Sequence, residues 1–170
     1  MRSIKILFAC CILFISLSVK AQSRMEIRAG SEKTRTASWD IGVSPGVFVN
    51  RRAYVSNSFT IGGDLRFQKK FSDKFTGLLS LGFQSIDAYP VNTIYYIKAG
   101  TKLFVSPIFY AAGEIGLGEY SEGGELLIYT PSIGIIAGKR LDFALKYESY
   151  SNLSWPYAQL GLRVGYRFSK

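Results

Sequence analysis

The sequence predicts an all-β protein, an eight-stranded antiparallel up-and-down barrel that spans a membrane. Three observations lead to this fold class. Apolar residues recur at every second position from Trp39 almost to the C-terminus, which is the period of a strand with two different faces. No stretch downstream of the N-terminal apolar run has the 3.6-residue period of an amphipathic helix. The alternating stretches are about 10 residues long, the length of a tilted strand that crosses the hydrocarbon layer.

The N-terminus has the layout of a secretory signal peptide. Arg2 and Lys5 precede an apolar run from Ile6 to Val19, and Val19-Lys20-Ala21 has the small residues of a cleavage site. We therefore expect residues 1–21 to be removed after Ala21. Both cysteines, Cys10 and Cys11, would leave with this segment, so a mature chain would have no disulfide and no cysteine metal site.

The mature chain is predicted to be one domain. Residues 22–36 are polar with little pattern and are interpreted as a periplasmic lead-in, in which the alternation of Met25, Ile27 and Ala29 leaves a short extra strand open. The barrel domain is predicted to cover residues 37–170. The formal charge of +9 falls to +6 without Arg2, Lys5 and Lys20. These charges alternate with apolar residues and form no block, so an anionic lipid surface is a better partner than nucleic acid.

Eight segments carry the alternation. Their apolar positions span Trp39–Val49, Phe59–Phe67, Phe75–Phe83, Tyr95–Leu103, Phe109–Leu117, Leu127–Ala137, Leu141–Tyr147 and Ala158–Phe168. None of these alternate positions carries a charged side chain. The opposite face is polar on every segment and holds the charged residues. A wetted apolar face of this size would exceed what soluble monomers tolerate, so we expect it to face lipid and the polar face to line the barrel interior.

An even strand number places both ends of the barrel on the periplasmic side. The connections Lys69–Lys74, Phe104–Pro107 and Gly138–Arg140 are then periplasmic turns, and Asn50–Asn57, Asp87–Thr93, Tyr120–Glu125 and Ser151–Pro156 are outer loops. Aromatic residues gather at both strand ends, as interfacial girdles do. Pro45 and Pro131 lie within strands, and because proline has no N–H to donate, we expect a β-bulge at each.

The last segment resembles the terminal signal by which outer-membrane barrels are recognised for insertion. It runs Gln159-Leu-Gly-Leu-Arg-Val-Gly-Tyr-Arg-Phe168, and its alternate residues Leu160, Leu162, Val164, Tyr166 and Phe168 would form the insertion signal, although Ser169 and Lys170 follow the terminal aromatic. The chain from Trp39 onward, with the segments IGVSPGVFV, IGGDLRF, GEIGLG and LDFALKYESY, is similar to the small OmpA/OmpX-like outer-membrane barrels. The resemblance implies eight strands around a narrow, filled interior and insertion by the barrel-assembly machinery.

The sequence has no histidine. Small barrels of similar kind that remodel lipid A depend on a histidine as general acid or base, so this chemistry is not expected here. Metal sites built from histidine or cysteine are excluded as well, and no cofactor is predicted.

Charged residues of the inner face are nearly balanced in sign. We predict an interior ion-pair network of Asp40, Asp64, Arg66, Lys98, Lys102, Glu114, Asp142, Lys146, Glu148, Arg163 and Arg167, because buried charges are tolerated only when they are paired. Two carboxylate pairs, Asp142 with Glu148 and Asp64 with Glu114, would be the acid/base candidates of an enzyme. The available cationic neighbours favour ion pairing over catalysis.

The sequence indicates less about function than about fold. The favoured hypothesis is a non-enzymatic integral barrel of the bacterial outer membrane with a structural or surface-interaction role and an interior filled by polar side chains. Its expected partners are outer-membrane lipid and lipopolysaccharide, whose phosphates Arg51 and Arg52 would contact through bidentate hydrogen bonds. Two alternatives stay open: a narrow conduit or small-solute or proton channel, and a soluble secreted binding barrel like a lipocalin. The sequence indicates no particular protein partner.

Overall fold

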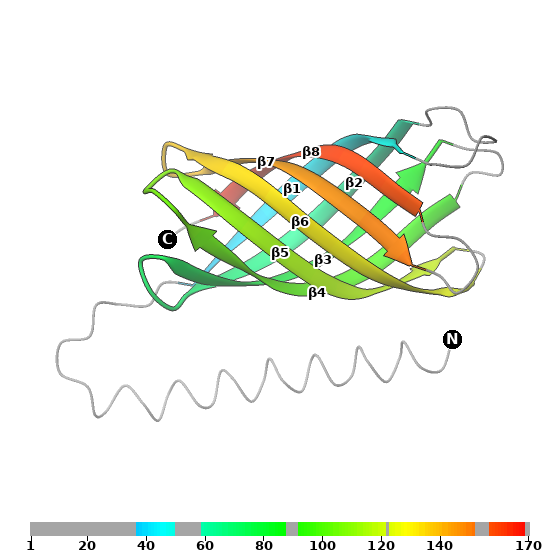
Figure 1. Cartoon of the computed structure of the whole chain (residues 1–170), viewed down its shortest axis with the longest axis horizontal. Coiled ribbons are helices and arrows are strands. Elements are labelled where there is room, and N and C mark those ends of the chain that lie inside the picture. The colour runs from blue at the N-terminus through cyan, green and yellow to red at the C-terminus, as the bar shows by residue number, and fades with distance from the viewer. Residues whose placement is uncertain (1–36, 50–58, 88–91, 122, 152–156, 169–170) are drawn as a thin grey trace, which may run out of the picture. The chain divides into compact units, whose positions relative to one another are not determined.

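The computed structural model describes residues 37–49, 59–87, 92–121, 123–151 and 157–168. It has eight strands (Figure 1): β1 (Ala37–Phe48), β2 (Phe59–Lys70), β3 (Phe75–Ile86), β4 (Asn92–Phe104), β5 (Phe109–Tyr120), β6 (Glu125–Ala137), β7 (Leu141–Ser151) and β8 (Tyr157–Phe168). Three predicted features lie outside the described residues: the signal peptide, the lead-in, and residues 169–170, which follow the last aromatic residue. No helix long and apolar enough to span a membrane occurs in the described ranges.

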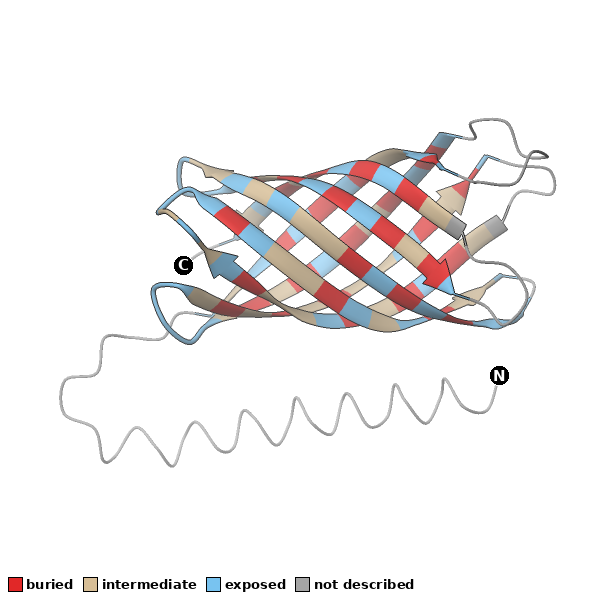
Figure 2. Ribbon diagram, viewed as in Figure 1, coloured by how far each residue is buried: buried red, intermediate tan, exposed pale blue. Residues whose placement is uncertain are grey.

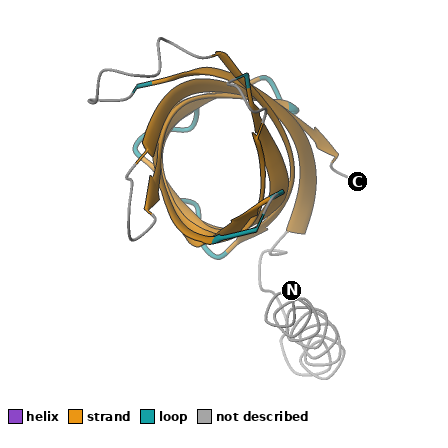
Figure 3. Ribbon diagram, turned by 90° about the vertical axis from the view of Figure 1, so that its right-hand side faces the viewer, coloured by secondary structure: helices purple, strands orange, loops and turns teal. Residues whose placement is uncertain are grey.

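The strands form a closed barrel in which each strand pairs antiparallel with the next (Figure 3). β8 closes the ring by pairing with β1, from Trp39 opposite Phe168 to Phe48 opposite Gln159. The sheet therefore has no edge strand, and the backbone groups of every strand face a neighbour. The predicted fold class and strand number are confirmed.

The two ends of the barrel differ. Short turns at residues 71–74, 105–108 and 138–140 join β2 to β3, β4 to β5 and β6 to β7, and β1 begins and β8 ends at this same end, which we call the turn end (left in Figure 1). The turns are closed by backbone hydrogen bonds such as Phe71 N to Phe75 O, 3.0 Å, and Val105 N to Phe109 O, 3.0 Å. Gly138 has a φ of 64°, a conformation that suits glycine. We call the opposite end, where the other connections lie, the loop end.

The alternation read from the sequence corresponds to the two faces of the barrel wall (Figure 2). Ile41, Val43, Leu65 and Leu162, for example, are exposed, whereas residues one position away are buried. The constant register of all eight strand pairs maintains this division along each strand, since a shift by one residue would exchange the faces.

The expected β-bulges at the two prolines are absent, and this prediction was wrong. Pro45 lies opposite Ile61 of β2 and Pro131 opposite Gly113 of β5, both in regular register. On the other side of each proline the ladder is interrupted, between Val43 and Gly46 on β1 and between Tyr129 and Ser132 on β6, and then resumes in unchanged register. The sheet accommodates the missing N–H by leaving out ladder contacts with one neighbour, without an extra residue.

The barrel interior has two zones. Its middle holds the charged side chains, whereas at the loop end an apolar cluster, here called the apolar plug, fills the lumen and consists of Phe48, Ile86, Ile94, Tyr96, Leu126, Ile128 and Tyr150. The rings of Phe48 and Tyr150 stack with centroids 6.2 Å apart. The expectation of an interior filled by polar side chains therefore holds for the middle of the barrel and is corrected at the loop end.

Candidate functional site

The interior charges form contacts that cross the lumen, and Arg163 of β8 is at the centre of one group. Its Nη2 donates to Asp40 Oδ1 of β1 at 2.5 Å and to Asp64 Oδ1 of β2 at 2.5 Å, and its Nε donates to Asp64 Oδ2 at 2.9 Å. Gln68 Nε2 donates to the other oxygen of Asp40. All four side chains are buried, so each carboxylate is compensated by a cation or an amide.

Two cross-strand glycines provide the space for the Arg163 guanidinium. Gly42 of β1 and Gly165 of β8 lie opposite each other in the ladder. A Cβ atom at either position would collide with guanidinium atoms of Arg163. The absence of two side chains on the inner wall thus lets a long cation lie flat between β1 and β8.

A second group joins β2 to β5. Arg66 Nη2 donates to Glu114 Oε2 at 2.6 Å, and Arg66 Nε donates to Ser80 Oγ at 3.0 Å. Ser80 in turn donates to the other oxygen of Glu114 at 2.5 Å. Every polar atom of the carboxylate therefore accepts a hydrogen bond from a buried donor.

A third group lies beneath the apolar plug. Glu148 Oε2 of β7 accepts from Lys146 Nζ at 2.9 Å and lies 3.2 Å from Lys98 Nζ of β4. Its other oxygen accepts from the Tyr150 hydroxyl at 2.8 Å. The Lys98 ammonium also lies 4.1 Å from the centroid of the Tyr96 ring, a cation–π contact.

The fourth group lies nearest the turn end. Asp142 of β7 accepts from Lys102 Nζ of β4 and from the Tyr110 hydroxyl of β5. Arg167 of β8 is more loosely held, since its Nη2 lies 3.9 Å from Asp142 Oδ2 and donates to Gln68 Oε1 at 3.4 Å. Arg167 is also the least buried of the predicted network residues.

All predicted network residues thus lie on the inner wall, and the structure joins them into these groups. The proposed carboxylate pairs are not brought together as catalytic pairs. Asp142 is bound by Lys102 and Tyr110 and Glu148 by Lys98, Lys146 and Tyr150, while Asp64 and Glu114 are bound by different arginines. No group of three or more residues of metal-ligating type occurs in the ranges that the structure describes.

The sequence interpretation missed Tyr150, which completes the third group, and Ile128 of the apolar plug. Tyr150 has the same strand parity as Glu148, and Ile128 the same parity as Thr130, so both could have been placed on the inner face by extending the alternation. They were not placed there, because the sequence does not indicate whether an apolar residue near a strand end contacts lipid, a loop or the lumen.

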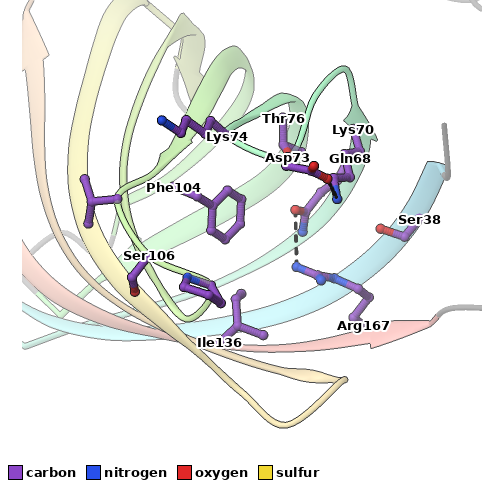
Figure 4. Close-up of a pocket in the computed structure, with 12 residues that line it drawn as sticks. Ser38, Gln68, Lys70, Asp73, Lys74, Thr76, Phe104, Ser106, Ile136 and Arg167 are labelled. Carbon is purple, nitrogen blue, oxygen red and sulfur yellow. Dashed lines mark hydrogen bonds and ion pairs between the residues drawn. The ribbon is translucent and has the colours of Figure 1, made fainter. Parts of the chain in front are cut away.

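A cavity of about 600 Å³ opens at the turn end (Figure 4). Gln68 and Arg167 border it on the side of the charge network, Lys70 and Lys74 come from the β2–β3 turn region, and Phe104 extends into it. The Phe104 ring packs against Tyr110, with centroids 5.7 Å apart. The cavity lining therefore combines polar and cationic side chains with apolar ones.

The other predicted sites are on the outside of the barrel or beyond what the structure describes. Leu160, Leu162, Val164, Tyr166 and Phe168 form the outward face of β8, which pairs with β1 and β7. Their role as an insertion signal stays a prediction. Arg51 and Arg52 lie outside the described residues, so the lipopolysaccharide contact stays a prediction as well.

Comparisons with known proteins gave matches among solved structures only. No protein-family profile matches the sequence, and no curated protein does. The attachment invasion locus protein Ail of Yersinia pestis matches with a TM-score of 0.61 at 14% identity, over 80% of this chain and 100% of that one. The N-terminal β-barrel domain of Pseudomonas aeruginosa OprF matches with a TM-score of 0.59 at 13% identity, over 77% and 97%. Neisserial surface protein A matches with a TM-score of 0.55 at 10% identity, over 80% and 100%.

At these identities the likeness is one of fold. Each of the three solved chains is covered almost entirely, so the eight-stranded barrel described here corresponds to a whole barrel in each of them. The chain therefore has the closed eight-stranded fold of small outer-membrane β-barrels, as its resemblance to the OmpA/OmpX-like proteins implied.

Proposed function

We propose that the protein is a non-enzymatic integral β-barrel of the bacterial outer membrane with a structural or surface-interaction role. The observation that carries this proposal is the outward face, which is exposed or half-buried on all eight strands, apolar except at Thr101, and without a charged residue at its alternate positions. An exposed apolar surface of this extent is stable in lipid and would aggregate in water.

Aromatic residues at both ends of the exposed face support the membrane position. Trp39 and Phe67 pack together at the turn end with ring centroids 4.9 Å apart. At the loop end Phe59, Tyr95 and Tyr129 are exposed on the outer wall. Such rings are typical of residues at the level of lipid headgroups.

The interior supports a closed barrel over a conduit. Members of the apolar plug are at most 8% exposed, so a water-sized sphere reaches little of their surface. Below the plug the ion pairs Lys98–Glu148 and Arg66–Glu114 are similarly enclosed. A lumen filled by its own side chains is the expected state of an eight-stranded barrel.

The interior also supports the absence of acid/base catalysis. The described interior carboxylates accept hydrogen bonds from neighbouring cations, hydroxyls or amides, which holds them in structural roles. The chain has no histidine to substitute for them.

Surface contacts belong to the same proposal. Arg51 and Arg52 in the connection between β1 and β2 would bind lipopolysaccharide phosphates, and the outward face of β8 would be recognised by the barrel-assembly machinery. Ail, which shares the fold, has been crystallised with the polysulfated heparin analogue sucrose octasulfate. Arg51 and Arg52 would give this chain an affinity for polyanionic saccharide groups.

A substitution in the outward face tests the membrane position. Ile133 is 62% exposed in the middle of β6, and Ile133→Arg should destabilise a lipid-embedded barrel by about 2–4 kcal/mol. Ser121→Arg, in an exposed loop-end position, is the matched control and should assemble normally. Outer-membrane fractionation and heat-modified mobility of unboiled protein report assembly. Recovery of the wild type as a soluble periplasmic monomer would refute the proposal.

Planar-bilayer recording separates the closed barrel from the conduit. The purified barrel should give no steps of conductance above background. Reproducible single-channel steps from the wild type would establish the conduit instead.

Lipopolysaccharide binding is tested separately by replacing Arg51 and Arg52 together with glutamine. The variant should assemble normally and lose affinity for lipopolysaccharide micelles, while Lys69→Gln at the turn end keeps it. Equal binding by the two variants would remove the arginines from the proposal and leave the membrane assignment standing.

A further inference from the structure

The turn-end cavity has features of a small-molecule site that the proposed surface role does not use. Its volume of about 600 Å³ falls in the range of known ligand pockets, about 300–1,000 Å³. The cavity lies between the turns and the charge network and opens away from the apolar plug. A ligand could therefore enter without disturbing the closed part of the lumen.

Arg167 is the interior cation whose bonding capacity is least used. In the described strands each of the other interior cations, Arg66, Lys98, Lys102, Lys146 and Arg163, has a carboxylate oxygen within 3.2 Å. The nearest carboxylate oxygen to Arg167, on Asp142, is 3.9 Å away and already accepts from Lys102. Arg167 Nε is buried and has no hydrogen-bond partner among the described residues.

The charge of the cavity wall favours an anion. Lys70, Lys74 and Arg167 contribute three cations, against one carboxylate from Asp73, which lies 2.8 Å from Lys70 Nζ. A guanidinium with an unused N–H matches the paired oxygens of a phosphate or carboxylate. The Arg167 side chain is 21% exposed and lines the cavity, so an anion there would meet the accessible part of the guanidinium.

Part of the lining is apolar. Phe104, Pro107 and Ile136 form this part, and the contact of Phe104 with Tyr110 fixes that ring beside the cavity. We propose that the cavity binds a small organic anion, a phosphate or carboxylate attached to a compact apolar group, with the anionic oxygens on Arg167 and the apolar group against Phe104 and Ile136.

Three water-soluble probes test the anionic group and the apolar group of the ligand separately. Wild-type barrel in phosphatidylcholine nanodiscs, in buffer of low salt without phosphate, is titrated by calorimetry with phenyl phosphate, inorganic phosphate and benzyl alcohol. Phenyl phosphate should bind about tenfold more tightly than either of the others, because only it has both a phosphate for Arg167 and a ring for Phe104 and Ile136. The ¹⁵N resonance of Arg167 Nε should shift during the phenyl phosphate titration.

Variants assign the contacts. Arg167→Gln should weaken phenyl phosphate binding about tenfold or more, whereas Lys139→Gln, an exposed cation of the β6–β7 turn outside the cavity, should leave it unchanged. Phe104→Ala should weaken phenyl phosphate and leave inorganic phosphate unaffected. Because Arg167 lies in the closing strand, heat-modified mobility verifies folding of each variant, and Phe104→Ala provides the test in a chain whose β8 is intact.

Defined results would overturn the proposal. These are absence of phenyl phosphate binding, an affinity no greater than that of inorganic phosphate, or equal loss of binding in Lys139→Gln and Arg167→Gln, which would indicate general attraction to a basic surface. Repeating the titration in nanodiscs that contain phosphatidylglycerol identifies the source of the anion: weakened phenyl phosphate binding indicates competition from a lipid headgroup, and unchanged binding indicates a soluble ligand.

Discussion

Arg163 shows how single residues determine the packing of this interior. Its guanidinium bonds Asp40 and Asp64 and occupies the space that Gly42 and Gly165 leave open. The arrangement needs both the carboxylates and the glycines. The guanidinium can reach Asp40 and Asp64 only because no side chain at positions 42 and 165 occupies its place.

Adding one methyl group tests this arrangement. Gly42→Ala should lower the free energy of unfolding by about 1–3 kcal/mol, because the new Cβ forces the guanidinium away from its carboxylates. Gly113→Ala is the control, since no atom lies within 4 Å of the Cβ it would add. Urea unfolding in lipid vesicles measures both, and equal stability of the two variants would contradict the packing described here.

Removing the cation tests the pairing. Arg163→Met leaves Asp40 and Asp64 buried without their cation and should destabilise the barrel by about 3–5 kcal/mol. Adding Asp40→Asn and Asp64→Asn to the same chain should restore much of this loss, because no uncompensated charge remains. If the triple variant is no more stable than Arg163→Met, the cost arises from lost packing and not from charge.

At the scale of elements, the two proline-containing strands are regular except for a local gap in the ladder. β6 contacts β5 through Pro131 and Gly113 but has no ladder contact with β7 between Tyr129 and Ser132. Because the register continues unchanged, the gap removes local bonding without changing which residues face lipid.

Restoring an N–H at this gap should strengthen the pairing of β6 with β7. Pro131→Ile keeps an apolar side chain on the outer wall and supplies a donor toward β7, so we expect a gain of about 0.5–1.5 kcal/mol in unfolding free energy. Amide hydrogen exchange of β7 residues beside the gap should slow in the variant. Unchanged exchange would mean that the proline ring, and not the missing donor, maintains the gap.

At the scale of the whole molecule, the barrel has an apolar outside, a charged middle and an apolar plug. Ile128 and Ile115 illustrate the difference between the two apolar surfaces: Ile128 is 0% exposed inside the plug and Ile115 is 57% exposed on the outer wall. Inside, neighbouring side chains surround the isoleucine. Outside, lipid chains would replace any contact that is removed.

The same truncation should therefore have unequal effects. Ile128→Ala should cost about 2–5 kcal/mol because it leaves a cavity in packed protein, and Ile115→Ala should cost clearly less. Unfolding of both variants in the same vesicles gives the comparison. Similar losses would mean that the plug is not packed as a core.

The sequence was sufficient to predict the barrel and the two faces of its wall, because the strand period alone determines which residues share a face. Lys102 and Asp142, for example, were both assigned to the interior from their parity. Their contact was not predictable, since it joins the non-neighbouring strands β4 and β7 and depends on the stagger of the whole ring. The plug was missed for a related reason: Phe48 and Leu126 meet only after the barrel closes.

The lumen-spanning ion pairs also bear on assembly. A β8 strand displaced by two residues along β1 would still turn Leu160 and Leu162 toward lipid. The burial of apolar residues therefore does not distinguish this shifted register from the correct one. In the shifted register Arg163 would move about 7 Å along the wall, away from Asp40 and Asp64. Only in the correctly closed ring does Arg163 pair with both carboxylates, so the register that closes the barrel is also the one that brings these buried charges together.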